Sequence, residues 1–356
     1  MKRNNNRSRF FSWATCLFAS FTLIACSADE TTVGKENGEQ LPVKVEAHIY
    51  EAGIGVTDFG KANINKANLS GAGTRAVTTA STNSFSDDDA MDVYDWVKGA
   101  SDTEEGIGKG EYIDNGFFVY RNGSWRCFED LVCKNRKSTH HFLAVFPRCP
   151  ITDFTAAPLT CNSNDNNDLL VGSASGSYNE LDGTVSFALK HALARLVVKV
   201  NKRTDIATDS DTRVTINALS KGTIDYTTPF VPAEDDAEAQ QVGTIAATVT
   251  ADANSETPLT LFLASEADDH RSYTHELVMI PQTTNLDAIS VDVSDALGNG
   301  HTYTPSSTEL RLRPGMTTTV TINIGRDLLT LGNVTVTPWT TETFDGEVEE
   351  EEVTTP

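Results

Sequence analysis

Cysteine is the residue type whose positions in this chain most directly suggest chemistry. Cys26 ends the run Leu23-Ile24-Ala25-Cys26, behind basic residues and an apolar stretch over residues 10–25. A basic start and an apolar stretch of this length are typical of an export signal and short for a membrane span. The cysteine at this place predicts cleavage by a lipoprotein signal peptidase and a diacylglycerol on its thiol. We therefore expect a signal peptide over residues 1–25 and a flexible lipid-anchored tether over residues 26–40.

The four cysteines beyond the tether are Cys127, Cys133, Cys149 and Cys161. Export would place them in an oxidising space, where disulfide bonds form. Four cysteines can pair in three ways, and we expect Cys127–Cys133 and Cys149–Cys161 because these pairs close short loops. A metal site that includes the adjacent histidines 140 and 141 is the alternative, but no CxxC or HxxxH spacing occurs there. We therefore expect no bound metal.

Residue types that could catalyse a reaction are present, but not in the arrangements that catalysis needs. The seven histidines are scattered, and Gly106-Ile107-Gly108-Lys109-Gly110 is not followed by the helix pattern of a nucleotide site. The acidic runs at 87–89 and 165–168 lack the spacing and the distal glutamate of a calcium loop. We therefore expect no enzyme activity and no cofactor.

The charge balance excludes one class of partner. The chain has 28 Lys and Arg against 50 Asp and Glu, a formal net charge of -22. Such a surface repels nucleic acid and anionic membranes. We expect no nucleic-acid partner, and we interpret the acidity as a soluble surface that does not self-associate.

Strand patterns dominate the elements that would position these residues. The stretch Val43–Ile49 alternates apolar and polar residues, which predicts a half-buried strand with Val43, Val45, Ala47 and Ile49 on one face. Further short apolar runs between turn residues predict strands at Gly116–Arg121, Phe142–Phe146, Leu169–Val171, Thr184–Leu189, Lys190–Val200, Arg213–Leu219, Val242–Val249, Leu259–Ala264, Glu276–Ile280, Ala288–Val293, Glu309–Leu312, Thr317–Ile324 and Asn333–Thr337. Residues 91–98 are the exception: they are the candidate for a short helix, although Val93, Tyr94, Trp96 and Val97 do not fall on one face.

This spacing of strands and turns is typical of β-sandwiches, since a parallel sheet would need helices between its strands. The length of 356 residues suits two domains. We expect an all-β chain with an N-terminal domain over residues 41–185, a C-terminal domain over residues 186–340 and an acidic tail over residues 341–356.

A small-residue loop follows the first predicted strand. It runs from Ser70 to Ala76 and contains one basic residue, Arg75. Exposed loops of this composition are common sites of proteolysis. Cleavage between Arg75 and Ala76 would leave the strand Val43–Ile49 no longer covalently held, so its sheet would have a vacancy.

Several motifs, in this order, resemble the landmarks of the fimbrillin-like family, the type V pilins and their minor subunits. They are Cys26, Thr74-Arg75-Ala76, Phe142-Leu143-Ala144-Val145-Phe146-Pro147, Asp168-Leu169-Leu170-Val171, residues 185–196 (VSFALKHALARL), Met279-Ile280-Pro281-Gln282-Thr283, Leu312-Arg313-Pro314-Gly315 and Val336-Thr337-Pro338-Trp339. None is catalytic, and most have an ordinary role in the fold, such as prolines that end strands. Together they cover nearly the whole mature chain.

The resemblance implies two tandem transthyretin-like β-sandwich domains and a fimbrial subunit that serves adhesion at the cell surface. It also implies an outer-membrane lipoprotein attached through Cys26, and cleavage after Arg75 in the loop that follows the first strand. Loss of Val43–Ile49 would let the terminal strand of a neighbouring pilus subunit fill the groove, with main-chain hydrogen bonds supplying affinity. A host or bacterial surface molecule is the expected ligand of such a subunit.

The tail fits this scheme poorly as a donor strand. Between residues 341 and 353 only Phe344, Val348 and Val353 are apolar, and four consecutive glutamates would be costly to bury. Either the donor is shorter and includes Val334 and Val336, or the subunit accepts a strand without donating one.

A permanently lipid-anchored surface protein, either a pilus anchor or a glycan-binding lipoprotein, is the alternative to a polymerising subunit. For the glycan version, Trp96 and Trp125 are the candidates for stacking on sugars.

Overall fold

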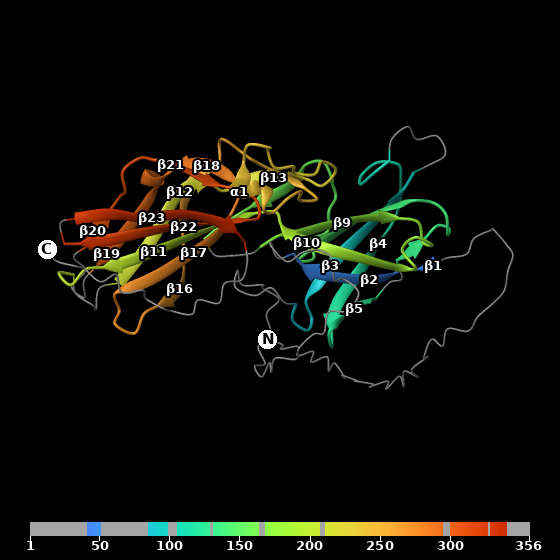
Figure 1. The fold of residues 1–356 in the computed structure, drawn as a ribbon, viewed down its shortest axis with the longest axis horizontal. Helices are drawn as coiled ribbons and strands as arrows, with labels where there is room; N and C mark the ends of the chain where they lie inside the picture. Colours follow the sequence, from blue (N-terminus) through green and yellow to red (C-terminus); the bar gives the residue numbers. More distant parts are fainter. Residues whose placement is uncertain are drawn as a thin grey trace, which may run out of the picture. The chain divides into compact units, whose positions relative to one another are not determined.

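The structure is a computed structural model, and strands make up nearly all of its ordered elements (Figure 1). It describes residues 41–50, 85–98, 105–128, 131–163, 168–206, 211–294, 300–326 and 328–339. Within these ranges the helices are one short α-helix, α1 (Ala237–Gln240), and one 3-10 turn, η2 (Leu286–Ala288). The predicted all-β class is confirmed. No helix in these ranges is long and apolar enough to cross a membrane.

A seven-stranded sheet holds the first part of the chain. Its strands, in spatial order, are β2 (Lys44–Ile49), β10 (Thr184–His191), β9 (Leu170–Gly176), β7 (His140–Phe146), β3 (Ala90–Val97), β4 (Glu111–Arg121) and β5 (Ser124–Cys127). All neighbours are antiparallel except β2 and β10, which run parallel. A separate short pair joins β1 (Leu41–Pro42) to β6 (Val132–Cys133).

Two further sheets enclose the core of the second part. One has the order β16 (Phe262–Glu266), β17 (Ser272–Met279), β11 (Ala194–Lys202), β22 (Met316–Gly325) and β23 (Leu328–Pro338). The other has the order β15 (Glu256–Thr260), β12 (Asp211–Leu219), β19 (Ile289–Ser294) and β20 (Gly300–Tyr303). Alternate side chains from both sheets, such as Val198, Ile216 and Ile322, share one buried cluster. This arrangement is a β-sandwich.

The first and second parts of the chain also share a core. A three-stranded sheet combines β8 (Ala157–Thr160) with β13 (Lys221–Asp225) and β14 (Thr248–Ala251). A last pair joins β18 (Gln282–Asn285) to β21 (Glu309–Leu312). One apolar cluster, here called the shared core, contains side chains from both parts, among them Leu143, Val145, Leu193, Ile280, Met316 and Trp339. The division into two domains stays a prediction, and β10 crosses the boundary that we placed after residue 185.

The predicted helix at residues 91–98 is wrong, because β3 occupies this stretch between β4 and β7. Met91 and Val93 point into the core of the seven-stranded sheet, whereas Tyr94 and Trp96 point into the shared core. A strand that is buried on both faces lacks alternation. Three other strand predictions also need correction. Lys190–Val200 is broken between His191 and Ala194, and β14 begins only at Thr248. Leu259–Ala264 spans the end of β15 and the start of β16, which lie in different sheets.

One buried histidine gives the fold a dependence on pH. His275 in β17 is 2% exposed, and burial lowers its pKa to about 4 from the ordinary value of 6.5. The unfolded chain therefore binds a proton at this residue as the pH falls below 6.5, while the folded chain does not until about pH 4. Stability is lost over that window.

We expect the free energy of unfolding to fall by roughly 3 kcal/mol between pH 6.5 and 4 through His275 alone. The variant His275→Leu should lack this component, because leucine has no proton to bind. Urea unfolding of both proteins across this pH range measures the difference. Parallel pH profiles would show that His275 does not cause the loss.

Candidate functional site

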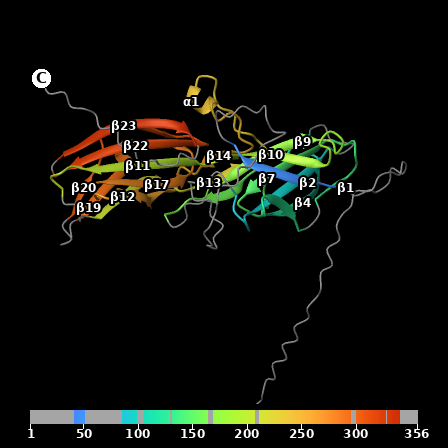
Figure 2. The same cartoon turned by 60° about the horizontal axis from the view of Figure 1, so that its bottom comes forward.

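The segment 41–50 fills a slot at the edge of the seven-stranded sheet. β2 pairs in parallel with β10, from Thr184↔Lys44 to Leu189↔Ile49, and the two strands lie side by side in both views (Figures 1 and 2). Backbone bonds from Lys44 N to Gly183 O, 2.9 Å, and from Tyr50 N to Leu189 O, 2.8 Å, extend this ladder at both ends. The first strand is therefore a full member of the sheet.

The side chains of this segment alternate as the sequence predicts. Val43, Val45 and Ile49 are buried, as is Leu41 before them, and their exposed fractions lie between 4% and 7%. Ala47 is half-buried, while Lys44 and Glu46 face solvent. Burying one such aliphatic side chain contributes about 1.5–3 kcal/mol, so these residues favour the position of the strand in the slot.

The far wall of the slot comes from the opposite end of the sheet. Trp125 in β5 donates from Nε1 to the carbonyl oxygen of Ala47 at 3.4 Å. The backbone N–H of Val43 donates to the carbonyl oxygen of Leu131 at 2.9 Å, and Leu41 pairs with Cys133. The segment 41–50 thus lies between β10 on one side and β5 and β6 on the other.

The floor of the slot is aromatic and aliphatic. Phe142, Phe146 and Phe187 are almost fully buried in the same cluster as Val45 and Ile49. Phe85 packs edge-on against Trp125 and Phe146, with ring centroids 4.8 and 5.2 Å away. Without its strand, this slot would present an apolar groove along the unpaired edge of β10. An extended chain with apolar residues at every second position would satisfy both surfaces.

A second group of side chains packs around Trp339, the last residue that the structure describes. Trp339 is 3% exposed and stacks on His191, with parallel rings 4.0 Å apart between centroids. The carboxylate of Asp168 accepts from His191 Nδ1 at 2.5 Å. The guanidinium of Arg195 lies 5.9 Å from the centre of the Trp339 ring and pairs with Glu276 in a buried ion pair at 2.5 Å. We call this group the Trp339 cluster.

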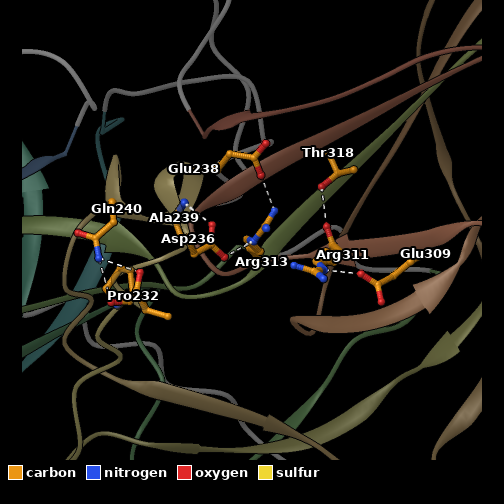
Figure 3. A network of polar contacts seen from close by, with 10 residues as sticks. Pro232, Asp236, Glu238, Ala239, Gln240, Glu309, Arg311, Arg313 and Thr318 are labelled. Carbon is orange, nitrogen blue, oxygen red and sulfur yellow. Dashed lines mark hydrogen bonds and ion pairs between the residues drawn. The ribbon is translucent and has the colours of Figure 1, made fainter.

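The turn Leu312-Arg313-Pro314-Gly315 contacts both this cluster and α1. Gly315 has φ of +69°, and a Cβ there would lie 2.7 Å from Val242, so glycine is needed. Its N–H donates to Leu193 O and its carbonyl oxygen accepts from Trp339 N. Figure 3 shows Arg313 pointing toward α1, where it pairs with Asp236 and Glu238, each at 2.7 Å.

The sequence motifs at residues 168–171, 185–196, 312–315 and 336–339 therefore meet in space. Sequence reasoning assigned them individually to strands, turns and core, and missed that they form one cluster. Their common signal is that polar, charged or aromatic residues (Asp, His, Arg and Trp) occur in or beside apolar runs. The cluster holds the chain in place at Trp339, two residues before the predicted tail begins at residue 341.

The shorter donor strand that the sequence suggests lies within β23, which ends at this cluster. Val334 and Val336 lie in β23, where they pair with Val320 and Thr318 of β22. A donor that includes them would have to leave that ladder and pull Trp339 from its stack. The tail 341–356 lies outside the described residues.

Several predicted site residues also lie outside the described ranges. These are the lipidation residue Cys26 and the processing residues Arg75 and Ala76, so their roles stay predictions. The strand that their processing would release is observed in place, with Val43, Val45, Ala47 and Ile49 facing the core as expected.

The predicted disulfide bonds are not formed. Cys133, Cys149 and Cys161 carry free thiols, which leaves neither Cys127–Cys133 nor Cys149–Cys161 closed. Burial raises the pKa of the Cys133 and Cys161 thiols to about 12, which keeps them protonated and unreactive. Cys133 belongs to the core beneath β1, and Cys161 to the shared core.

The interpretation of Trp96 and Trp125 as sugar-stacking residues is wrong, because they are only 3% and 9% exposed. Trp96 packs in the shared core and Trp125 lines the slot. Neither indole presents a free face to a glycan.

A further buried pair joins His140 to Asp95, 2.7 Å apart from Nδ1 to the carboxylate. Burial raises the pKa of Asp95, and the histidine opposes part of this shift. Both side chains are fully buried, so no substrate could reach the free His140 Nε2. The pair therefore links β7 to β3. Within the described ranges, no group of three or more His, Cys, Asp and Glu side chains could hold a metal ion.

Residues 74–339 match the model of the fimbrillin-like family. A candidate cell adhesion protein from Bacteroides ovatus is 16% identical, over 85% of this chain and 99% of its own, with a TM-score of 0.54. A candidate cell adhesion protein from Bacteroides uniformis is also 16% identical, over 84% of this chain and 99% of its own, with a TM-score of 0.51. Both likenesses show a shared fold.

The structure of the tip fimbrial protein Mfa3 from Porphyromonas gingivalis, truncated at its C-terminus, is 10% identical. It matches over 71% of this chain and 95% of its own, with a TM-score of 0.41. No curated protein sequence matches the chain.

We expect the substitution Val45→Asp to lower the free energy of unfolding by roughly 2–4 kcal/mol, because it places a carboxylate without a partner in the apolar slot. The neighbouring exposed change Lys44→Asp should cost about 0.5 kcal/mol or less. Urea unfolding measures both. Equal costs would contradict the alternating burial of β2.

We expect Trp339→Ala to cost about 3–5 kcal/mol and to speed hydrogen exchange of the β23 amides, because the stack on His191 is lost. Thr335→Ala, an exposed change on the same strand, should leave exchange unaltered. Unchanged β23 protection in the Trp339 variant would show that the cluster does not hold this strand.

Proposed function

The chain belongs to the fimbrillin-like family, and from this premise we propose that it is a subunit of cell-surface fimbriae that accepts a strand from a neighbouring subunit. In this proposal, the strand at 41–50 occupies the slot while the precursor is exported. Proteolysis then frees it, and the terminal strand of another subunit takes its place.

The observation that carries the proposal is the position of β2. It is an edge strand that pairs with β10 through its whole length. Its buried side chains cover one side of the apolar core. An edge strand can leave without breaking the ladders between the other six strands. Its parallel pairing on β10 also supports a replaceable role, because parallel pairing is slightly less stable per residue than antiparallel pairing.

In this proposal, the precursor is cleaved between Arg75 and Ala76. The family match begins at residue 74 and leaves out the whole strand 41–50, which supports a mature subunit that starts near this point. Before cleavage, two or more acyl chains at Cys26 would hold the precursor stably at the outer membrane. The run Ser27-Ala28-Asp29-Glu30 resembles an acidic signal for the outer face of that membrane.

The subunit accepts a strand but is a poor donor. The tail contains four consecutive glutamates and few apolar residues, and β23 before it is tied to β22 and to the Trp339 cluster. A subunit that only accepts a strand would lie at one end of a fimbria, because there is no next subunit whose groove it must fill. The alternative of a permanently anchored glycan-binding protein loses its aromatic candidates, because Trp96 and Trp125 are buried.

We expect protein sheared from the cell surface to begin at Ala76. The variant Arg75→Ala should remain lipidated at Cys26 and stay with the cells, because the strand 41–50 is not released. Lys66→Ala, which removes another basic residue before the cleavage site, is the matched control and should be processed normally. N-terminal sequencing and mass spectrometry measure the outcome. Sheared wild-type protein that still contains residues 41–50 would reject the strand-exchange proposal, and wild-type protein found only in lipidated form would favour the permanent anchor.

A further inference from the structure

A pocket of about 280 Å³ opens beside the shared core, away from the strand slot. Its floor is made by buried side chains from both parts of the chain: Ala157, Cys161, Leu169, Leu193, Ile224 and Tyr226. Exposed residues, including Cys149 and Pro158, form its rim. A cavity of about 150 Å³ with apolar walls is large enough to hold benzene, so this pocket can hold one ring with a short substituent.

The buried part of the pocket lining contains one phenol. Tyr226 is 3% exposed and lines the pocket together with aliphatic side chains. Burial raises its pKa, so the hydroxyl remains protonated and able to donate. A ligand acceptor that bonds to this hydroxyl would be shielded from water by the apolar walls, which strengthens the hydrogen bond.

The charges around the pocket exclude an ionic ligand. Among the described residues that line it, none is a lysine or an arginine. Their one carboxylate, that of Asp168, already accepts from Leu169 N at 2.8 Å and from His191 Nδ1 at 2.5 Å. An anion would find no counter-charge, and a cation would compete with both of these bonds.

The rim argues against an extended peptide as the occupant. Pro147, Pro150 and Pro158 line the pocket, and proline has no backbone N–H to donate to a strand ladder. A small molecule is therefore a better fit than an added strand.

We propose that this pocket binds a small, uncharged, largely apolar molecule that carries one hydrogen-bond acceptor, with the acceptor on the hydroxyl of Tyr226. The site is independent of the strand slot, so it stands or falls separately from the fimbrial assembly proposed above.

The test uses acetophenone, which has one ring and one carbonyl acceptor, and ethylbenzene, which has nearly the same shape without the acceptor. The protein is the full chain with Cys26→Ser, which removes one competing thiol. Cys149 is exposed on the rim, so a bound molecule should slow its alkylation by N-ethylmaleimide. Peptide mapping by mass spectrometry follows this thiol alone.

We expect acetophenone to protect Cys149 in a saturable way, with an affinity on the order of fivefold above that of ethylbenzene. Tyr226→Phe keeps the ring but removes the donor, so it should make the two affinities equal. Ala157→Leu fills the floor and should abolish protection by both, and thermal unfolding will show whether this variant is folded. No saturable protection in the parent chain, or an unchanged preference for acetophenone in Tyr226→Phe, would overturn the proposal.

Discussion

The structure depends on one requirement, that the backbone groups of β10 find partners along the whole strand. β9 pairs with Lys190 and His191 at its end, and β2 pairs with Thr184 to Leu189 from a segment joined to the rest through residues 51–84. Because Val185, Phe187 and Leu189 of β10 also face the core, an unpaired β10 would expose polar edge and apolar face together. Any mature form that loses the first strand must therefore find another chain to fill this edge, and the proposed assembly follows from that demand.

The Trp339 cluster shows a different use of buried polarity. Ion pairs and histidine–carboxylate bonds inside a protein contribute little net stability, but they fix geometry because a broken pair leaves a buried charge. Here they connect β10, β11, β17 and the end of β23 at one point. We interpret the cluster as the contact that fixes how these strands of the first and second parts of the chain are aligned.

Much of this could be read from the sequence, for physical reasons that differ from element to element. The strand at 43–49 is half-buried, so its alternation was visible. β3 is buried on both faces, so it carried no period and was taken for a helix. The pocket at Tyr226 and the convergence of Asp168, His191 and Trp339 join residues that are far apart in the chain, and no local pattern encodes such contacts. The expected disulfides rest on loop length alone, and loop length does not show that Cys133 and Cys161 are buried.

β10 connects the slot, where a neighbouring subunit would pull on this one, to the Trp339 cluster. Its edge borders the slot, and its last residue, His191, stacks on the tryptophan from which the tail departs. In the proposed fimbria, tension entering through a strand in the slot would act along β10. Such a load shears the hydrogen bonds of the ladder together instead of opening them one at a time. The mechanical strength of the joint would then be set by the length of β10 and not by the affinity of any single contact.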